Sequence, residues 1–385
     1  MIRVLHVIGM MERGGAETYL MNLYRAIDRT KVQFDFLVHE EHECAYNAEI
    51  RALGGHLYAL PRPSAASLFT SYARACRCFF DQHHTSSGDS LWPIVHGHMG
   101  SSALVYLHEA RKAGCHAIAH SHCVNFYLGS AGLAFKMATF PDRYIAQSFM
   151  ACSRDAGIDR FGKRIVESDR FSVARNGIFC SSYACDQITH ERTKRALGLE
   201  GRPVFGHVGL LRPEKNHAFL LDTFAHIRRE LPRAVLLLVG GGALEGELRH
   251  HARELGIADS VAFLGSSDIV PELLKAMDVF IFPSQREGLG MALIEAQAAG
   301  LPCLCSEGIP RDALIAQDVR VLPLSDGTHV WADAAVALYQ ETAQRPRTDH
   351  TTLIAQAGFD IETTAQWLED FYLAICANSS HNEKR

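Results

Sequence analysis

Short apolar runs alternate with helical patterns along most of the chain. Residues 2–8 form an apolar run of β-branched character that ends at Gly9, and residues 16–27 follow with apolar positions at helical spacing. The first half repeats this arrangement, with predicted strands at residues 34–38, 94–98 and 116–120 and predicted helices at residues 46–53 and 101–112. Strands that alternate with helices predict a parallel sheet covered by helices on both faces.

A second series of the same kind follows a polar segment at residues 179–203. Residues 203–209 and 234–239 predict strands, and residues 216–230 predict an amphipathic helix between them. The alternation continues at residues 245–255, 261–264, 270–277, 279–282 and 291–299. We therefore predict an α/β protein of two doubly wound domains, with the boundary in or beside the polar segment.

The composition is that of a globular protein of 385 residues, with 48% apolar and 21% charged residues. A chain of this length exceeds what one hydrophobic core usually accommodates, which again favours two domains. No run reaches the roughly 18 apolar residues that a membrane-spanning helix needs, and residues 1–20 lack a signal-peptide cleavage site. The eleven cysteines are an odd number without any C-x-x-C spacing. We expect a cytoplasmic protein with reduced thiols.

Charge narrows the class of partner. The net charge of −5 argues against nucleic acid as a partner. The first half is slightly basic and the second half is acidic. That asymmetry gives weak support for a first domain that faces an anionic membrane or substrate, although solvated surface explains it equally well.

Histidine pairs stand at the ends of two predicted strands, at His96 and His98 and at His120 and His122. Alternate residues of a strand share one face, so adjacent strands would bring four imidazoles together, a set that could bind zinc or copper. Single histidines at strand ends are more often ordinary hydrogen-bonded groups. We therefore predict no metal site and keep a catalytic or substrate contact open for one of the four.

Several common nucleotide motifs are missing. Two G-x4-G spacings lack the lysine that a Walker A loop needs to reach the phosphates, and no G-x-G-x-x-G follows the first strand. No two aspartates stand at positions i and i+2, which removes the simplest clamp for a metal-bound diphosphate. The sequence therefore favours a reaction without a metal ion.

Residues 278–302 combine a strand, a glycine-bearing loop and a helix that stops at Gly300. The backbone amides of residues 288–291 are expected at the helix N-terminus, where they favour a phosphate. Glu287 stands just before that helix and Glu295 stands inside it. Carboxylates beside a phosphate site repel the ligand unless they accept hydrogen bonds from hydroxyls, so the pattern fits the sugar and the ribose of a nucleotide sugar.

A second cluster, at residues 208–217, also follows a predicted strand and precedes a helix. Arg212 and Lys215 could neutralise a leaving diphosphate, a role of positioned cations when no metal is present. The alternative is a basic first turn on a solvated helix, which the helix dipole disfavours.

Seven segments in order resemble the retaining glycosyltransferases of family 4, and especially their bacterial exopolysaccharide and capsule branch. The segments are residues 14–17 (GGAE), 119–122 (AHSH), 151–157 (ACSRDAG), 173–178 (VARNGI), 209–217, 261–265 (VAFLG) and 287–295, the E-x7-E motif. The resemblance covers nearly the whole chain. It implies the GT-B architecture, in which two Rossmann-like domains face each other across a cleft.

The resemblance also implies the domain limits and the site. Residues 1–180 and a last helix at about 361–385 would form the acceptor-side domain, and residues 181–360 would bind the nucleotide sugar. Glu287 would lie near the donor sugar hydroxyls, Glu295 on the ribose, Lys215 on the phosphates and His122 near the transferred sugar. The predicted catalytic residues are His122, Arg212, Lys215 and Glu287. The predicted donor-binding residues are Gly14, Gly15, Gly209, Gly288, Leu289, Gly290, Met291 and Glu295.

One position departs from the family pattern. The family usually has arginine directly after the glycine of the G-R-x4-K loop, where this chain has Leu210 and carries its arginine two residues later. Either Arg212 reaches the phosphate from the shifted position, or catalysis is weakened.

The sequence therefore predicts a retaining, metal-independent glycosyltransferase of exopolysaccharide or cell-surface glycan synthesis. No cofactor is expected; the donor would be a UDP- or GDP-linked sugar, and the acceptor a saccharide or lipid-linked saccharide. Acceptor contacts are expected in loops at residues 10–18 and 125–136. Peripheral association with the inner face of the cytoplasmic membrane is a further hypothesis. The alternatives are a catalytically impaired GT-B partner protein and a nicotinamide-dependent oxidoreductase.

Overall fold

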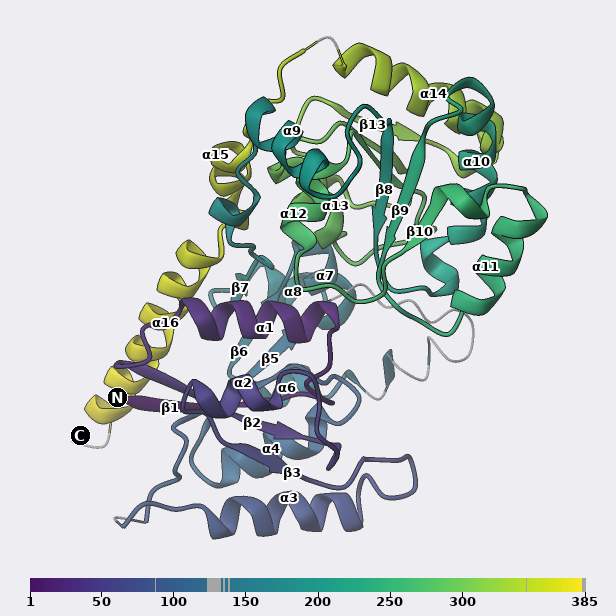
Figure 1. Cartoon of the computed structure of the whole chain (residues 1–385). Helices are drawn as coiled ribbons and strands as arrows, with labels where there is room; N and C mark the ends of the chain where they lie inside the picture. The colour runs from purple at the N-terminus through teal and green to yellow at the C-terminus, as the bar shows by residue number, and fades with distance from the viewer. Residues whose placement is uncertain (87, 123–132, 134–135, 138, 344, 383–385) are drawn as a thin grey trace. The chain divides into compact units, whose positions relative to one another are not determined.

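The computed structural model describes residues 1–86, 88–122, 133, 136–137, 139–343 and 345–382. It divides into two compact units. Unit 1 comprises Met1–Ile178 and Ile361–Arg385, and unit 2 comprises Phe179–Asp360. Each unit is built around its own parallel sheet (Figure 1). The expected α/β class with two doubly wound domains is confirmed.

Unit 1 contains a seven-stranded sheet in the order β3-β2-β1-β4-β5-β6-β7, in which every neighbouring pair is parallel. The central strands are covered on both faces, so they read as apolar runs; all seven residues of β2 are buried. The strands are β1 (Ile2–Val7), β2 (Val32–Val38), β3 (Leu57–Ala59), β4 (Ile94–Gly97), β5 (His116–Ser121), β6 (Ser148–Ala151) and β7 (Phe171–Val173).

The helices of unit 1 cover this sheet, and the last helix of the chain is one of them. In Figure 1 α16 runs beside α1, and its Tyr372 hydroxyl hydrogen-bonds to His96 Nδ1 at 2.6 Å. The half-exposed Lys31 also donates from Nζ to Oε1 of the buried Glu369 at 2.7 Å. The helices are α1 (Gly15–Ala26), α2 (Asn47–Ala52), α3 (Ser71–Gln82), α4 (Ala103–Lys112), α6 (Asp142–Ile145), α7 (Arg154–Phe161), α8 (Lys163–Val166) and α16 (Ile361–Asn382).

Unit 2 contains a six-stranded parallel sheet in the order β10-β9-β8-β11-β12-β13. Helices α10 and α14 lie side by side over it (Figure 1). The strands are β8 (Val204–Val208), β9 (Val235–Val239), β10 (Val261–Phe263), β11 (Val279–Phe282), β12 (Cys303–Ser306) and β13 (Val319–Leu322). The helices are α9 (Gln187–Ala196), α10 (His217–Glu230), α11 (Glu245–Glu254), α12 (Val270–Ala276), α13 (Met291–Ala298), α14 (Gly327–Thr342) and α15 (Thr351–Ile354).

Short turns complete unit 2, and two of them position candidate site residues. Turn η1 (Cys180–Tyr183) begins the unit, and turn η2 (Pro213–Lys215) lies between β8 and α10. The polar segment expected at the domain boundary contains helix α9, because Asp186 caps it by accepting the backbone N–H of Thr189. The boundary itself falls between Ile178 and Phe179.

Candidate active site

The carboxyl edge of the unit 2 sheet gathers most of the residues that the sequence predicts for donor binding. The chain connections diverge between the neighbouring strands β8 and β11. In doubly wound sheets, ligands bind outside the carboxyl ends of the strands at such a switch point. Residues 209–217 follow β8 and residues 283–295 follow β11. Both predicted clusters of this unit therefore lie at the switch point.

Lys215 and Glu287 form a direct ion pair there. Lys215 Nζ donates to Glu287 Oε1 at 2.5 Å, and their side chains are only 18% and 11% exposed. The ammonium also lies 5.3 Å from the centroid of the Phe282 ring. Lys215 ends turn η2, and Asn216, with φ of 59°, turns the chain from η2 into α10. The fold thus holds a cation and a carboxylate together at the end of β8 and β11.

Backbone contacts fix the two loops that carry this pair. The N–H of Gln285 donates to the Glu214 carbonyl at 2.8 Å, and the N–H of Glu287 donates to the Gly308 carbonyl at 3.2 Å. Gly240, at φ of 132°, packs so closely that a Cβ atom would overlap the Gly209 carbonyl oxygen. The loops that carry the ion pair are therefore held by backbone contacts.

Helix α13 begins four residues after Glu287, at Met291, and its N-terminus lies at the same edge. Gly290 caps the helix in the left-handed conformation, with φ of 85°, and Met291 is the first helical residue. The first amides of a helix have no acceptor within it, and together with the dipole they favour an anion. Leu289 is buried, whereas Gly288 is partly exposed. Gly288, Leu289, Gly290 and Met291 therefore lie at the N-terminus of α13.

Glu295 lies farther along α13 and has an unexpected partner. The Tyr183 hydroxyl of turn η1 hydrogen-bonds to its carboxylate. Burial raises the pKa of Glu295 to about 7, and the Tyr183 hydrogen bond only partly opposes this shift. Glu295 therefore titrates near neutral pH, unlike an ordinary surface glutamate.

Arg212 and Leu210 stand on the same loop, outside the ion pair. The Arg212 side chain is exposed, and the described residues give its guanidinium no hydrogen bond or ion pair. Leu210 is partly exposed, while its neighbour Leu211 is buried in the core. The structure brings Lys215 and Glu287 together, and within the described part of the chain Arg212 shares no hydrogen bond or ion pair with either of them.

In unit 1, the predicted glycines and His122 also lie at the carboxyl edge of the sheet. Gly14 caps α1 after the loop that follows β1, and Gly15 is the first residue of that helix. A Cβ atom on Gly14 would meet only the flexible end of the Glu17 side chain, and a Cβ atom on Gly15 would meet nothing within 4 Å. Neither glycine has a positive φ. The fold itself therefore does not require glycine at residue 15.

His122 follows β5 and is held by a second histidine. Its Nε2 lies 2.7 Å from His98 Nδ1, and the Tyr19 ring contacts it edge-on at 5.7 Å between centroids. Burial lowers the pKa of His122 to about 4, and contact with the Asn176 side chain acts in the opposite direction. The imidazole is therefore neutral at physiological pH. The predicted acceptor loop at residues 125–136 lies largely outside the described residues.

Sequence reasoning missed three of the contacts at these edges. Tyr183 lies in a polar segment without periodicity, and nothing in its neighbourhood points to Glu295. Asn176 belongs to the VARNGI segment, so the resemblance marked it without giving it a role. His6 sits within an apolar run, and only the pairing of β1 with β4 brings it opposite His96.

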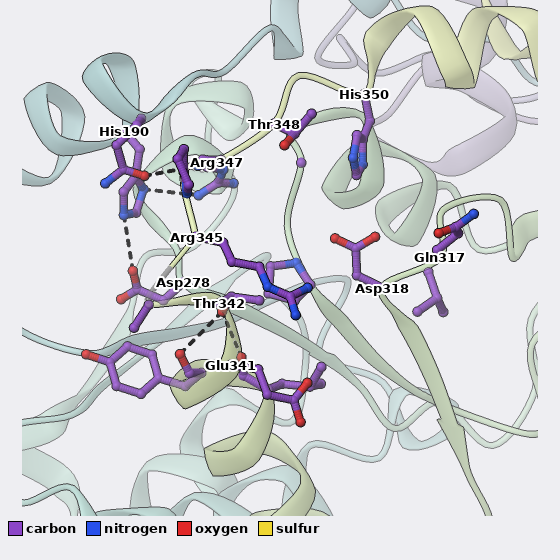
Figure 2. Close-up of a pocket in the computed structure, with 18 of the residues that line it drawn as sticks. His190, Asp278, Gln317, Asp318, Glu341, Thr342, Arg345, Arg347, Thr348 and His350 are labelled. Atoms are coloured by element: carbon purple, nitrogen blue, oxygen red, sulfur yellow. Dashed lines mark hydrogen bonds and ion pairs between the residues drawn. The ribbon is translucent and has the colours of Figure 1, made fainter.

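The structure also contains a cavity of 640 Å³ at the opposite, amino-terminal edge of the unit 2 sheet (Figure 2). Asp278 and Asp318 line it, and each directly precedes a strand. The Arg347 guanidinium donates to the carbonyls of Met277 and Ala299 at 2.7 and 2.8 Å. Asp278 accepts from Lys194 at 2.7 Å. Arg347, Asp278 and Lys194 are already bonded to the backbone or to one another, so we do not assign the donor to this cavity.

Among the described residues, no helix has both the length and the apolar content to cross a membrane.

Solved structures define the class of fold. HepE of Anabaena, crystallised with UDP and glucose, superposes with a TM-score of 0.76 at 18% identity over 97% of this chain and 100% of that one. Sucrose-phosphate synthase of Thermosynechococcus elongatus gives a TM-score of 0.77 at 16% identity over 98% and 100%. The fold is GT-B.

Sequence relatives then define the family. Residues 189–322 match the family described as "Glycosyl transferases group 1", and residues 14–155 match "Glycosyl transferase 4-like domain". A putative glycosyltransferase of Bacillus subtilis, EpsF, is 35% identical over 99% of this chain and 98% of its own length. The chain belongs to the glycosyltransferases of group 1, family 4, as the resemblance implied.

A further relative has a fuller description. The UDP-Gal:alpha-D-GlcNAc-diphosphoundecaprenol alpha-1,3-galactosyltransferase of Escherichia coli is 26% identical over 74% of this chain and 76% of its own length.

Proposed function

We propose that this glycosyltransferase moves a sugar from a UDP- or GDP-linked donor to a saccharide or lipid-linked saccharide acceptor, with retention of configuration and without a metal ion. The ion pair of Lys215 and Glu287 beside the N-terminus of α13 carries the proposal. The cation and the amides at the helix N-terminus suit a diphosphate. The carboxylate suits the hydroxyl groups of the sugar that the diphosphate carries.

The names of the similar proteins support this choice of substrates. EpsF and the E. coli enzyme are named as transferases, and the name of the latter gives a UDP-linked donor and a lipid-diphosphate acceptor. HepE was crystallised with UDP and glucose. Family membership also favours transfer over the oxidoreductase alternative.

The proposed mechanism begins when the donor phosphates take the Lys215 ammonium from Glu287. The freed Glu287 carboxylate accepts hydrogen bonds from the sugar hydroxyls, and Glu295 accepts those of the ribose. The bond between the anomeric carbon and the phosphate oxygen breaks, and the acceptor oxygen bonds to the same face of that carbon. The leaving phosphate oxygen takes the acceptor proton, while Lys215 and Arg212 stabilise its charge. His122 in unit 1 contacts the transferred sugar as a neutral group.

Donor turnover tests the proposed role of Glu287. Nucleotide release from UDP- and GDP-sugars, measured with an acceptor extract, should fall roughly 100-fold or more in Glu287→Ala, because one preorganised polar contact to a transition state is worth about that much. Glu214→Ala is the matched control, since it removes an exposed carboxylate from the neighbouring loop but keeps the backbone carbonyl that binds Gln285. Equal turnover by wild type and Glu287→Ala would refute the assignment.

Two further measurements address the stereochemistry and the metal. NMR of the product should show the anomeric configuration of the donor, and an inverted product would refute the proposed mechanism. Turnover should not fall in EDTA; loss of activity that Mg²⁺ or Mn²⁺ restores would show a metal requirement.

Membrane association can be tested separately. Liposomes that contain anionic lipid should retain the protein at low salt and release it at high salt, since the attraction is electrostatic. A protein that does not bind these liposomes at low salt would refute the proposed peripheral association.

A second candidate function is that of an impaired partner protein, favoured by Leu210 and by the exposed position of Arg212. Leu210→Arg discriminates between the two. A gain of roughly 100-fold in turnover would show that the native chain is impaired, whereas full activity of the wild type would remove this candidate.

A further inference from the structure

Five imidazoles gather at the carboxyl edge of the unit 1 sheet. They come from three adjacent strands, since β1 pairs with β4 and β4 pairs with β5. Neighbouring rings lie 4.1 to 5.3 Å apart between centroids. The sequence predicts four of them, and the register of β1 adds the fifth. The cluster consists of His6, His96, His98, His120 and His122.

The hydrogen bonds within this cluster run mainly from one imidazole to another. His98 uses both ring nitrogens: Nε2 lies 3.0 Å from His6 Nδ1, and Nδ1 lies 2.7 Å from His122 Nε2. His120 Nδ1 lies 3.1 Å from His96 Nε2, whereas His120 Nε2 is buried without a partner among the described residues. Within the same part of the chain, no carboxylate is bonded to any of the five rings.

This arrangement differs from that of ordinary core histidines. A buried imidazole is normally satisfied by backbone carbonyls or hydroxyls, as His207 is by the Ile281 carbonyl at 2.9 Å. Here the partners from outside the cluster are the Tyr372 hydroxyl, bonded to His96 at 2.6 Å, and the Asn176 side chain, which contacts His122. A buried polar nitrogen without a partner is unfavourable, and a cation that accepts several lone pairs would remove that penalty.

We propose that His98, His120 and His122 bind one late first-row divalent cation, for which Zn²⁺ is the probe. One nitrogen of each ring lies within 4.8 Å of the others. Nitrogens that bind zinc at 2.0–2.1 Å in a tetrahedron lie about 3.3 Å apart, so only small ring movements are needed. Three imidazoles without thiolate or carboxylate suit zinc, copper or nickel rather than calcium or magnesium.

The remaining two histidines act as an outer layer. His6 bonds the Nε2 of His98, and His96 bonds the Nδ1 of His120. The metal would therefore take the opposite nitrogens, Nδ1 of His98 and Nε2 of His120. Such outer partners fix the tautomer and the ring orientation of metal ligands. His98 and His122 are partly exposed, which gives the ion a route of entry. A second trio, of His6, His96 and His98, is more deeply buried and less accessible.

The ion would affect transfer through His122. If that histidine contacts the sugar, as the proposed function requires, the bound cation occupies its lone pair and inhibits the reaction. This inhibition rests on the proposed function, but the binding itself does not. The two can therefore be measured independently.

Metal binding to the full chain tests the proposal without any substrate. Metal-stripped wild type should bind one equivalent of Zn²⁺ in competition with a chromophoric chelator. His98→Gln and His120→Gln should each weaken binding by more than the roughly 10- to 100-fold that loss of an outer partner causes. His116→Gln is the matched control, because His116 lies on β5 with His120 but bonds Ser148 at 2.9 Å and belongs to neither trio.

X-ray absorption at the zinc edge of the wild type keeps the test valid if a variant fails to fold. The spectrum should show nitrogen ligands at about 2.0–2.1 Å and no sulfur. The proposal is overturned by sulfur ligation, by binding no tighter than that of His98→Gln, or by equal loss in His116→Gln. Zinc binding without inhibition of transfer would leave the site intact and count against the role of His122.

Discussion

The ion pair between Lys215 and Glu287 joins two groups with opposite preferences for a nucleotide sugar. The ammonium attracts the diphosphate, and the carboxylate repels it but accepts hydroxyl donors. The two groups lie 2.5 Å apart, and a backbone hydrogen bond from Gln285 to Glu214 joins their loops. When a donor binds, Lys215 can therefore exchange Glu287 for the diphosphate, and Glu287 can exchange Lys215 for sugar hydroxyls.

A comparison of two lysines separates catalysis from folding. Lys215→Met should lower kcat roughly 100- to 1,000-fold through lost stabilisation of the leaving phosphate, and it should also lower Tm because the enclosed Glu287 carboxylate loses its partner. Lys194→Met breaks a similarly enclosed ion pair with Asp278 at the other edge of the sheet, so it should lower Tm and leave kcat nearly unchanged. Thermal unfolding and steady-state kinetics measure both. Loss of kcat in Lys194→Met but not in Lys215→Met would place the reaction at the amino-terminal edge of the sheet instead.

Glu295 should give donor binding a pH dependence. A carboxylate that accepts ribose hydroxyls must be ionised, and the pKa of Glu295 is raised to about 7. Donor affinity should therefore fall as pH drops from 8 to 6, by up to about tenfold per unit below the pKa. Calorimetric titration of UDP and GDP over this range tests it.

The same shift also has a consequence for stability, with the opposite direction. A carboxyl whose pKa is higher in the folded state favours folding when protonated, so its contribution declines as pH rises from about 4.5 to about 7. Glu295→Gln should flatten both the affinity profile and this part of the stability profile. A wild-type affinity that is constant from pH 6 to 8 would contradict the assignment.

At the scale of elements, strands that alternate with helices were predictable, whereas sheet order and distant contacts were not. The E-x7-E segment carries its own helix start and stop, so the sequence placed α13 to within one residue. Strands β3 and β7 have three residues each and lack a recognisable period. Tyr183 reaches Glu295 across more than a hundred residues, and His6 joins the histidine cluster through strand order. Such contacts are set by tertiary packing, which local patterns do not encode.

Helix α1 offers a test of why its first residue is glycine. Gly15→Ala meets no neighbour within 4 Å and needs no special φ, so it should stabilise the protein by about 0.4–1 kcal/mol. If substrate approaches this backbone, the same substitution should raise KM or lower kcat. Gly246→Ala in the first turn of α11, which also has open space, is the control and should alter only stability. Unchanged kinetics in Gly15→Ala would remove the predicted close approach.

At the scale of the whole molecule, unit 1 is assembled from two distant parts of the chain. The backbone N–H of Ile361 donates to the Ile178 carbonyl at 2.9 Å, where the chain leaves the unit and where it returns. Helix α16 then buries Leu368 and Tyr372 in the unit. The last helix is therefore part of the unit 1 core.

Removal of that helix should affect the two units differently. A chain truncated after Asp360 exposes the surface that Leu368 and Tyr372 cover and loses several kcal/mol from unit 1, since burying each large apolar side chain contributes about 1.5–3 kcal/mol. Hydrogen exchange should then be fast in β1 and β4 and still slow in β8 and β11. Equal protection of both sheets would show that α16 is dispensable.

The return of the chain to unit 1 sets an order for folding on the ribosome. All of unit 2, from Phe179 to Asp360, has been translated before the first residue of α16 is added. Unit 1 is thus synthesised first but completes its fold last. The apolar surface that α16 covers stays exposed until unit 2 has been translated. We therefore expect chaperones to bind mainly the N-terminal part of the nascent chain.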